Sequence, residues 1–328
     1  ISTLSVTGLT SNPTIFEHAI AQSTDYDTAI SQLLGKGFST EQLFFELAVE
    51  DLVAAADLFR PIHEATVGVD GFVSLEVSPT LADDADGTIE EAKRLHGQAQ
   101  RPNLFIKVPG TEAGTVAIEE LIFAGVPINV TLLFSREHYL AAAEAYLRGL
   151  ERRHEAGLSL DIASVASLFI SRWDVAANKT LPAEHHNKLG IAVGQRTFTA
   201  YLNLLASDRW QKLAAAGARP QRLLWASTGS KDPSLPKGYY VTALAADNTV
   251  NTMPEATLLA FGESGEVGDL MTGDASQAES DIAAVEQAGV SIDGLAAELQ
   301  IQGRDSFVDS FDKLLGAIEQ KVASLKAA

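Results

Sequence analysis

The 328-residue sequence contains no cysteine, which excludes disulfide bonds, thiolate metal ligands and cysteine nucleophiles. Long apolar runs are also absent, because none approaches the roughly 18 residues that a membrane-spanning helix needs. No secretory signal is visible at the start of the chain. These features are compatible with a reducing cytoplasm, and we predict a cytoplasmic protein.

Positive charge is scarce. The chain has 24 Lys and Arg against 43 Asp and Glu, for a formal net charge of −19. A chain this acidic is a poor binder of nucleic-acid backbones and of anionic membranes, so neither is a predicted partner. The charges are dispersed, which indicates a role in solubility. A small anionic substrate would need a local basic pocket.

Apolar residues are plentiful, and at 46% of the chain they can fill the core of one large α/β domain. Short apolar runs alternate with longer amphipathic ones. Many of the short runs are nearly continuous in Val, Ile, Leu and Phe, as is typical of strands covered on both faces. The predicted strands are 5–10, 70–78, 103–108, 127–133, 160–168, 222–227 and 247–252.

Helix signals separate these strands. Ser39 and Gln42 have the spacing of a capping box. The last helix is predicted from a stripe of helical period between Phe307 and Leu325. Other helices are predicted to start after Thr111 and Ser135 and to end at Gly125 and Gly157, and another to open at Asp274 and Gln277.

The alternation of strands and helices indicates parallel strands joined by crossover helices. We predict a single (β/α)8 TIM barrel over residues 1–328, with extra C-terminal helices from about 274 to 328. An open doubly wound sheet is the second choice, but no strand precedes a glycine-rich dinucleotide loop. Seven strands are recognisable and a closed barrel needs eight, so the first strand is expected upstream of Ile1, where the chain lacks an initiating Met.

In such a barrel, functional side chains lie at the C-terminal ends of the strands. Lys107 stands near the end of the third strand between Ile106 and Val108. Buried lysines are rare unless they are paired or catalytic, and an apolar wall favours the neutral amine that attacks a carbonyl. Lys107 could equally extend to solvent or pair with Glu76. The strand context alone leaves both interpretations open.

The predicted strands before and after that of Lys107 carry further polar residues. Glu76 lies inside the apolar second strand, and Asn129 and Thr131 alternate in the fourth strand so that both face one side. Beside Thr131, a carboxylic acid can hold a water for the proton transfers of Schiff-base chemistry, although Glu76 could instead be a buried partner of a donor. Asn12 and Asn129 could orient substrate hydroxyls or satisfy backbone groups of loops.

The late strands end in candidates for anion binding. Arg172, Ser227 and Lys231 lie at or after the ends of two of these strands, and loops at this position commonly hold phosphate. An arginine offers phosphate a bidentate fork and a hydroxyl adds a donor, whereas surface ion pairs are the simpler alternative. The motifs of zinc proteases, serine hydrolases and P-loop NTPases are absent.

Five strand-end motifs occur in a characteristic order and resemble the transaldolase family in its longer bacterial type. The resemblance implies a (β/α)8 transferase with no cofactor and no metal, acting in the pentose phosphate pathway. Such an enzyme moves a dihydroxyacetone unit from sedoheptulose 7-phosphate or fructose 6-phosphate to an aldose phosphate. The motifs are "GLTSNPTIF" from Gly8, "SLEVSP" from Ser74, "LFIKVPGT" from Leu104, "INVTLLFS" from Ile128 and "NTMPEAT" from Asn251.

The resemblance also implies residue roles. Lys107 would form the Schiff base, and Glu76 with Thr131 would hold the catalytic water. The dihydroxyacetone part would be bound by Asn12, Asn129 and Ser167, and the phosphate by Arg172 and Ser227.

The sequence departs from the family in two places. The stretch "STGSK" lacks the second phosphate-binding arginine that many relatives have, and Lys231 is a possible substitute for it. The chain also starts beyond the strand that carries a catalytic aspartate in relatives. A lyase that cleaves without transfer and an inactive sugar-phosphate-binding barrel are the alternative functions. The oligomeric state stays open, with a homodimer as one option.

Overall fold

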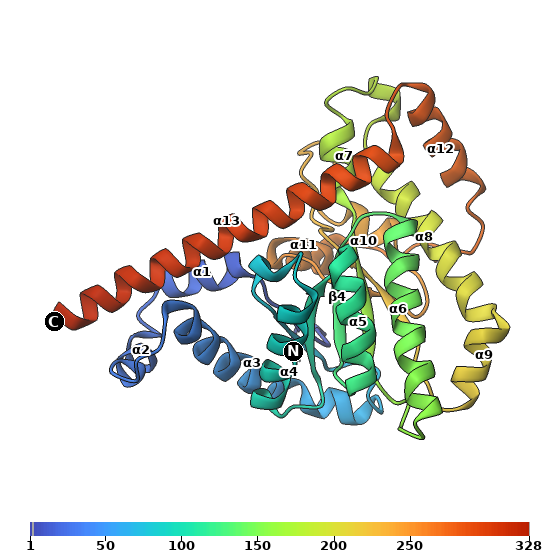
Figure 1. Ribbon diagram of the computed structural model, residues 1–328. Helices are drawn as coiled ribbons and strands as arrows, with labels where there is room; N and C mark the ends of the chain where they lie inside the picture. Colours follow the sequence, from blue (N-terminus) through green and yellow to red (C-terminus); the bar gives the residue numbers. More distant parts are fainter. Residues whose placement is uncertain (2, 328) are drawn as a thin grey trace.

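The computed structural model describes residue 1 and residues 3–327. Its described part contains one curled sheet of seven parallel strands, each paired with its neighbour in the chain (Figure 1). This sequential order is that of a (β/α) barrel, whereas an open doubly wound sheet reverses its order at a switch point. All seven predicted strands are confirmed, five with shorter bounds and two, β3 and β6, shifted by one residue: β1 (Leu9–Thr10), β2 (Val73–Glu76), β3 (Leu104–Pro109), β4 (Ile128–Leu133), β5 (Ser164–Phe169), β6 (Gln221–Ala226) and β7 (Val250–Asn251).

Helices connect and cover the strands. Two single turns of 3-10 helix, η1 (Pro79–Leu81) and η2 (Ala183–His185), accompany them. The α-helices are α1 (Pro13–Gln22), α2 (Asp27–Leu33), α3 (Thr40–Ala65), α4 (Ala85–Ala99), α5 (Glu112–Ala124), α6 (Arg136–Glu155), α7 (Ser171–Ala177), α8 (Leu189–Ala206), α9 (Asp208–Ala215), α10 (Tyr239–Ala243), α11 (Glu255–Ser264), α12 (Ser276–Gln287) and α13 (Ile292–Ala327).

The predicted helix boundaries are mostly confirmed. The capping box of α3 is formed, because Ser39 Oγ accepts from the Gln42 amide at 3.1 Å and Gln42 Oε1 accepts from the Ser39 amide at 2.9 Å. The side chains of Thr111 and Ser135 cap α5 and α6. The helix predicted to open at Asp274 and Gln277 is confirmed as α12, which begins at Ser276; Asp274 lies in the loop before it, and its Oδ1 accepts from the Ser276 amide at 2.9 Å.

The core has an outer and an inner part. Between the sheet and the helices lie branched aliphatic side chains such as Ile106, Val108 and Val130, which are fully buried. Inside the curl of the sheet the packing is aromatic, and the rings of Phe72 and Phe105 stack with centroids 4.1 Å apart. Both faces of the central strands are therefore covered, which explains their continuous apolar sequences.

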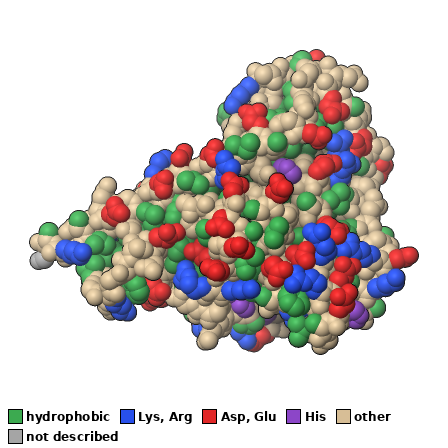
Figure 2. Space-filling view, viewed as in Figure 1, with side chains coloured by type: hydrophobic (Ala, Val, Ile, Leu, Met, Phe, Trp, Pro, Cys, Tyr) green, Lys and Arg blue, Asp and Glu red, His purple; other side chains and the backbone are tan. Residues whose placement is uncertain are grey.

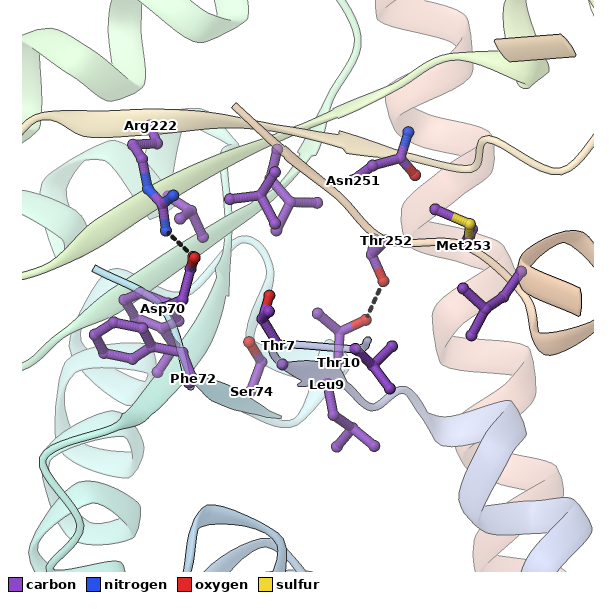
Figure 3. Close-up of a pocket in the computed structure, with 18 of the residues that line it drawn as sticks. Thr7, Leu9, Thr10, Asp70, Phe72, Ser74, Arg222, Asn251, Thr252 and Met253 are labelled. Carbon is purple, nitrogen blue, oxygen red and sulfur yellow. Dashed lines mark hydrogen bonds and ion pairs between the residues drawn. The ribbon is translucent and has the colours of Figure 1, made fainter. Parts of the chain in front are cut away.

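The two edges of the sheet, β1 and β7, approach each other. Thr10 Oγ1 and Thr252 Oγ1 are 2.9 Å apart, but the sheet order shows no backbone pairing between β1 and β7 within the described residues. A cavity of about 220 Å³ lies beside this contact and reaches Thr7, Phe72 and Arg222 (Figure 3). The eight-stranded prediction is thus met in part, by a barrel-like curl of seven described strands.

Charged side chains of both signs are interspersed on the face of the molecule in Figure 2. This face shows no continuous basic surface of the kind that binds a phosphate backbone. Within the described residues, every helix is too short or too polar to cross a membrane.

The last helix, α13, crosses the C-terminal ends of the strands and continues along α1 (Figure 1). Its predicted apolar stripe is confirmed, since Phe311, Leu314 and Ile318 are buried. The ring of Phe311 packs edge-on against Phe44 of α3, with centroids 5.6 Å apart. The stripe anchors α13 over the end of the sheet at which the predicted functional residues lie.

Candidate active site

Lys107 lies at the centre of the candidate site. The strand register places it between Glu76 on β2 and Asn129 on β4. Its side chain is only 9% exposed, its Nζ lies 3.5 Å from Glu76 Oε1, and it donates to the backbone oxygen of Ser11 at 3.3 Å. The ring centroid of Phe307, from α13, is 5.7 Å from Nζ. Lys107 is therefore both buried, as the nucleophile interpretation requires, and paired with Glu76.

Glu76 faces this amine from the neighbouring strand. Burial raises the pKa of its carboxyl, and the nearby Lys107 ammonium opposes the rise. Its Oε2 is buried and has no hydrogen-bond partner among the described residues. A carboxyl biased towards its protonated form, with one oxygen available, can give a proton to a reacting group and take it back.

Thr131 completes this part of the site. It is buried on β4, and its Oγ1, like Glu76 Oε2, lacks a partner in the described chain. Both residues line a cavity of about 10 Å³ beneath Phe307, which is close to the volume that one water needs. The two oxygens can hold a water between them, which would satisfy polar groups that are otherwise costly to bury.

A chain of hydrogen bonds crosses the inner face of the sheet. Ser167 Oγ donates to Asn129 Oδ1 at 2.7 Å, and Asn129 Nδ2 donates to Ser74 Oγ at 3.1 Å. Ser74 was not among the predicted site residues. Its position two residues before Glu76 was the signal that could have identified it, because residues at this spacing share a strand face. These two hydrogen bonds fix the orientation of the Asn129 amide beside Lys107.

Asn12 has the capping role that was one of its two predicted alternatives. Its Oδ1 accepts from the Ile15 amide at 3.0 Å, and Pro13 follows as the first residue of α1. Asn12 and Glu76 line one small cavity, so the asparagine does lie at the same end of the sheet. Its amide nitrogen makes no hydrogen bond within the described residues.

A second cluster lies where β5 and β6 end. Arg172 forms no ion pair or hydrogen bond among the described residues, its guanidinium carbon lies 5.4 Å from the centroid of the Phe169 ring, and burial lowers its pKa. Ser171 and Ser227 join the two strand ends through a contact of 2.9 Å between their hydroxyl oxygens. Ser227 has a φ of 56°, which is uncommon for serine. Arg172 thus offers a partly buried, unneutralised cation to an anion.

Lys231 is not brought into this cluster by any described contact. It is exposed in the loop after β6, next to Asp232, which accepts a hydrogen bond from Asn187 Nδ2 at 2.8 Å. No hydrogen bond or ion pair joins Lys231 to Arg172 or Ser227 in the described chain. Its role as a substitute for the missing arginine stays a prediction.

Two groups of residues therefore converge at the same end of the sheet. The amine of Lys107, with Glu76 and Thr131, can form and hydrolyse a carbon–nitrogen bond, because nucleophile and proton carrier are adjacent. Arg172 and Ser227 can bind an anion. Within the described residues, no three His, Asp or Glu side chains converge to form a metal site.

Comparison with known proteins gives consistent results. A family model described as "Transaldolase/Fructose-6-phosphate aldolase" matches residues 1–318. A protein of Thermobifida fusca (strain YX) named "Transaldolase" is 44% identical over 333 residues, covering 99% of this chain and 90% of the relative. "Transaldolase 2" of Streptomyces coelicolor is 43% identical over 329 residues, covering 98% and 88%, and "Transaldolase" of Saccharopolyspora erythraea is 44% identical over 333 residues, covering 99% and 90%.

Proposed function

Because the chain belongs to the transaldolase/fructose-6-phosphate aldolase family, we propose that it is a transaldolase in which Lys107 forms an imine with a ketose phosphate. The observation that carries the proposal is the buried Lys107 amine 3.5 Å from the Glu76 carboxyl. The names of the relatives support the transfer reaction. The activity assigns the protein to the pentose phosphate pathway of the cytoplasm, with sugar phosphates as substrates.

The proposed reaction uses the two groups of the site in turn. The Lys107 nitrogen adds to the ketose carbonyl, and loss of water gives the imine. The imine then accepts the electron pair of the carbon–carbon bond that breaks, while the hydroxyl of the departing carbon gives its proton to a base, the role that the resemblance implies for an aspartate on the relatives' first strand. An aldose phosphate leaves and a dihydroxyacetone enamine stays on the enzyme. The enamine attacks the acceptor aldehyde, and water releases the new ketose phosphate. Glu76, through a water on Thr131, carries the protons of the addition and dehydration steps.

Substrate binding is assigned to the remaining polar residues. Asn12, Asn129 and Ser167 would hydrogen-bond the hydroxyls of the dihydroxyacetone unit. Arg172 and Ser227 would bind the phosphate, with Lys231 as a further cation in the adjacent loop. The unneutralised guanidinium of Arg172 supports the phosphate site, because buried charges are normally paired.

We further propose that one more parallel strand closes the sheet between β1 and β7, giving a single eight-stranded barrel domain. The sheet already curls so that Thr10 meets Thr252, and a cavity of about 220 Å³ separates the two strands on one side of that contact. Open edges leave backbone donors and acceptors unpaired, which a closing strand would satisfy. The resemblance to transaldolases implies a catalytic aspartate on that strand.

The dependence of product formation on an acceptor tests the proposed function. With fructose 6-phosphate and erythrose 4-phosphate, we expect sedoheptulose 7-phosphate and glyceraldehyde 3-phosphate in equal amounts. Without an acceptor, turnover should stop after about one equivalent, because the dihydroxyacetone unit stays bound as the enamine. Continuous release of free dihydroxyacetone without an acceptor would instead identify a lyase, and the absence of any product would indicate an inactive barrel.

Replacing Arg172 with alanine should selectively lower kcat/KM for phosphorylated substrates. A charge-assisted contact contributes roughly 1.5–3 kcal/mol, so kcat/KM for fructose 6-phosphate should fall by about 10- to 150-fold. The corresponding value for unphosphorylated fructose, which lacks the anion, should change by less than about threefold.

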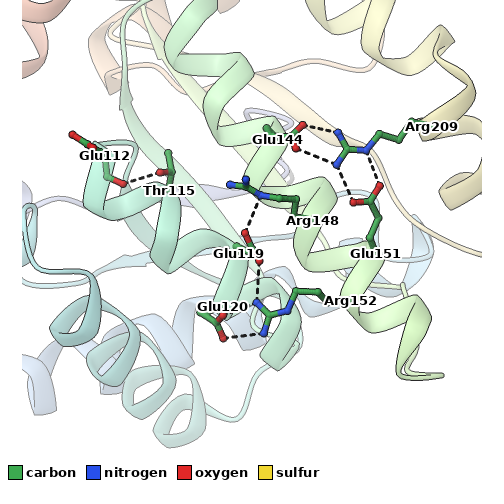
Figure 4. A network of polar contacts seen from close by, with 9 residues as sticks. All are labelled: Glu112, Thr115, Glu119, Glu120, Glu144, Arg148, Glu151, Arg152 and Arg209. Carbon is green, nitrogen blue, oxygen red and sulfur yellow. Dashed lines mark hydrogen bonds and ion pairs between the residues drawn. The ribbon is translucent and has the colours of Figure 1, made fainter.

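A matched control for this variant is Arg148→Ala. Arg148 is on the surface of α6 and pairs with Glu119 at 2.9 Å in the ion network of Figure 4. Arg148→Ala should leave kcat/KM unchanged for both fructose 6-phosphate and fructose. An equal loss on phosphorylated and unphosphorylated substrates in Arg172→Ala would show that Arg172 is structural.

A further inference from the structure

We infer that Gln300 of α13 is a positioning residue for the proposed reaction, acting through the strand that carries Thr131. The inference rests on the proposed function. Gln300 Nε2 donates to the backbone oxygens of Gly110 and Leu132, both at 3.0 Å. Gly110 directly follows β3, the strand of Lys107, and Leu132 directly follows Thr131 on β4. One side-chain amide therefore holds the ends of both catalytic strands.

Leu132 has an unusual backbone conformation. Its φ is 61°, in the left-handed region that residues with a side chain rarely adopt. Such conformations persist only where the surroundings enforce them, and they concentrate at functional sites. The carbonyl that Gln300 binds is that of Leu132 itself, so the hydrogen bond acts on the strained peptide directly.

This conformation belongs to a bulge in β4. Val130 pairs with Ala166 and Leu133 pairs with Leu168, so Thr131 and Leu132 together occupy the space opposite one residue of β5. A bulge changes the direction of the side chains within it. Thr131 lines the small cavity that Glu76 also lines, and its hydroxyl oxygen is buried without a hydrogen-bond partner among the described residues. The left-handed turn at Leu132 thus determines where the Thr131 hydroxyl points.

The β3 side of the bulge is fixed by the same contact. The Gly110 backbone amide donates to the backbone oxygen of Thr131 at 2.7 Å, and the backbone oxygen of Gly110 accepts from Gln300 Nε2. Thr131 is therefore held from both sides, through Gly110 and through Leu132. Without the donor at Gln300, the peptide at Leu132 can relax to an ordinary conformation and turn the Thr131 hydroxyl away from Glu76.

One face of α13 fits this region closely. Gly303, one turn after Gln300, lies so near Leu132 that an added Cβ would be 3.0 Å from Leu132 Cδ2. Phe307, one turn further, covers the Lys107 amine. Residues at this spacing share a helix face. The face of α13 that carries Gln300, Gly303 and Phe307 therefore forms the roof of the candidate site.

The docking of α13 does not depend on Gln300. Phe311, Leu314 and Ile318 are buried further along the helix, and Lys321 Nζ pairs with Asp27 Oδ1 at 2.9 Å. A variant that lacks only the amide donor should keep α13 in place. This separates the proposed positioning role from a general role in folding.

The variant Gln300→Met tests the inference, because methionine has a similar length but no N–H donor. We expect kcat to fall by about 10- to 100-fold, since small displacements of catalytic groups cost rate on this scale, while KM changes by less than about threefold. The control is Gln302→Met on the same helix, because Gln302 is exposed and, in the part of the chain that the structure describes, donates only to Glu298 Oε1. Gln302→Met should retain the kcat of the unmodified protein.

A double-mutant cycle with Thr131→Val separates positioning from structure. If Gln300 acts through the Thr131 hydroxyl, Gln300→Met should lower kcat by less than about threefold once that hydroxyl is absent. The inference would be overturned if the fold-losses in kcat of the two single variants multiply in the double variant, or if Gln300→Met keeps an unchanged kcat.

A second variant covers the case in which Gln300→Met does not fold. Gln300→Asn keeps an amide but is too short to reach both carbonyls, and it should lower kcat in the same way. A fully active Gln300→Asn would overturn the inference. The proposed function fails separately, if the unmodified protein transfers no dihydroxyacetone unit.

Discussion

Lys107→Arg is expected to lower kcat for dihydroxyacetone transfer by roughly 10⁴-fold or more, the scale on which the loss of a catalytic nucleophile reduces turnover. The guanidinium stays protonated and offers no lone pair to the substrate carbonyl. Its positive charge still faces Glu76, so the buried carboxyl keeps a partner and the fold should persist. Coupled detection of released glyceraldehyde 3-phosphate measures the rate, and circular dichroism checks the fold.

The matched control is Lys93→Arg, an exposed position on α4. This variant should have unchanged kcat and KM. A Lys107→Arg protein that keeps more than about one hundredth of the normal kcat would contradict the assignment of Lys107 as the nucleophile.

Glu76→Gln should lower kcat by about 10²- to 10³-fold, within the range for the loss of a general acid–base group. Glutamine matches the size of glutamate and can still bind a water, but it cannot transfer a proton. Pre-steady-state measurement of imine formation should locate the loss in the dehydration and hydration steps. Unchanged kcat would show that Glu76 is only a buried partner of Lys107.

The same variant should change how stability depends on pH. Burial raises the folded-state pKa of Glu76 above that of a glutamate in the unfolded chain. The stabilisation from the protonated form is therefore fully present below the unfolded pKa and is lost as the pH rises through the folded pKa. Glutamine does not ionise, so the Tm of Glu76→Gln should rise relative to that of the unmodified protein as the pH increases.

Glu91→Gln is the control for kcat. Burial also raises the pKa of Glu91, but this carboxyl accepts from the Ser78 amide at 2.6 Å and pairs with Arg94 rather than with Lys107. Its replacement should leave kcat near normal.

A Tm difference between Glu76→Gln and the unmodified protein that is constant with pH would contradict the raised pKa of Glu76.

The strands were predictable where both faces are buried. In β3 and β4 every residue is buried, so nearly the whole sequence of each strand is apolar and the signal is strong. At the edges of the sheet, pairing covers only Leu9–Thr10 and Val250–Asn251, although longer runs were predicted there. Edge strands pair on one side only, and the local sequence does not record where that pairing stops.

The site was predictable to the extent that parallel strands bring their ends together. Lys107, Glu76 and Thr131 were identified because polar residues stand out in apolar strands, and the register then makes them neighbours. Gln300 was not identified from the sequence, because its contact with Leu132 spans 168 residues. Helical periodicity predicted α13 but not the strands that it covers.

The central claim, that Lys107 forms the imine, is tested most directly by chemical trapping. The protein is incubated with fructose 6-phosphate, reduced with borohydride, digested and mapped by mass spectrometry, because reduction makes the imine permanent. We predict one dihydroxyacetone-derived adduct per chain, on the peptide that contains Lys107, and none in Lys107→Arg. An adduct on another lysine, or equal trapping in Lys107→Arg, would contradict this account.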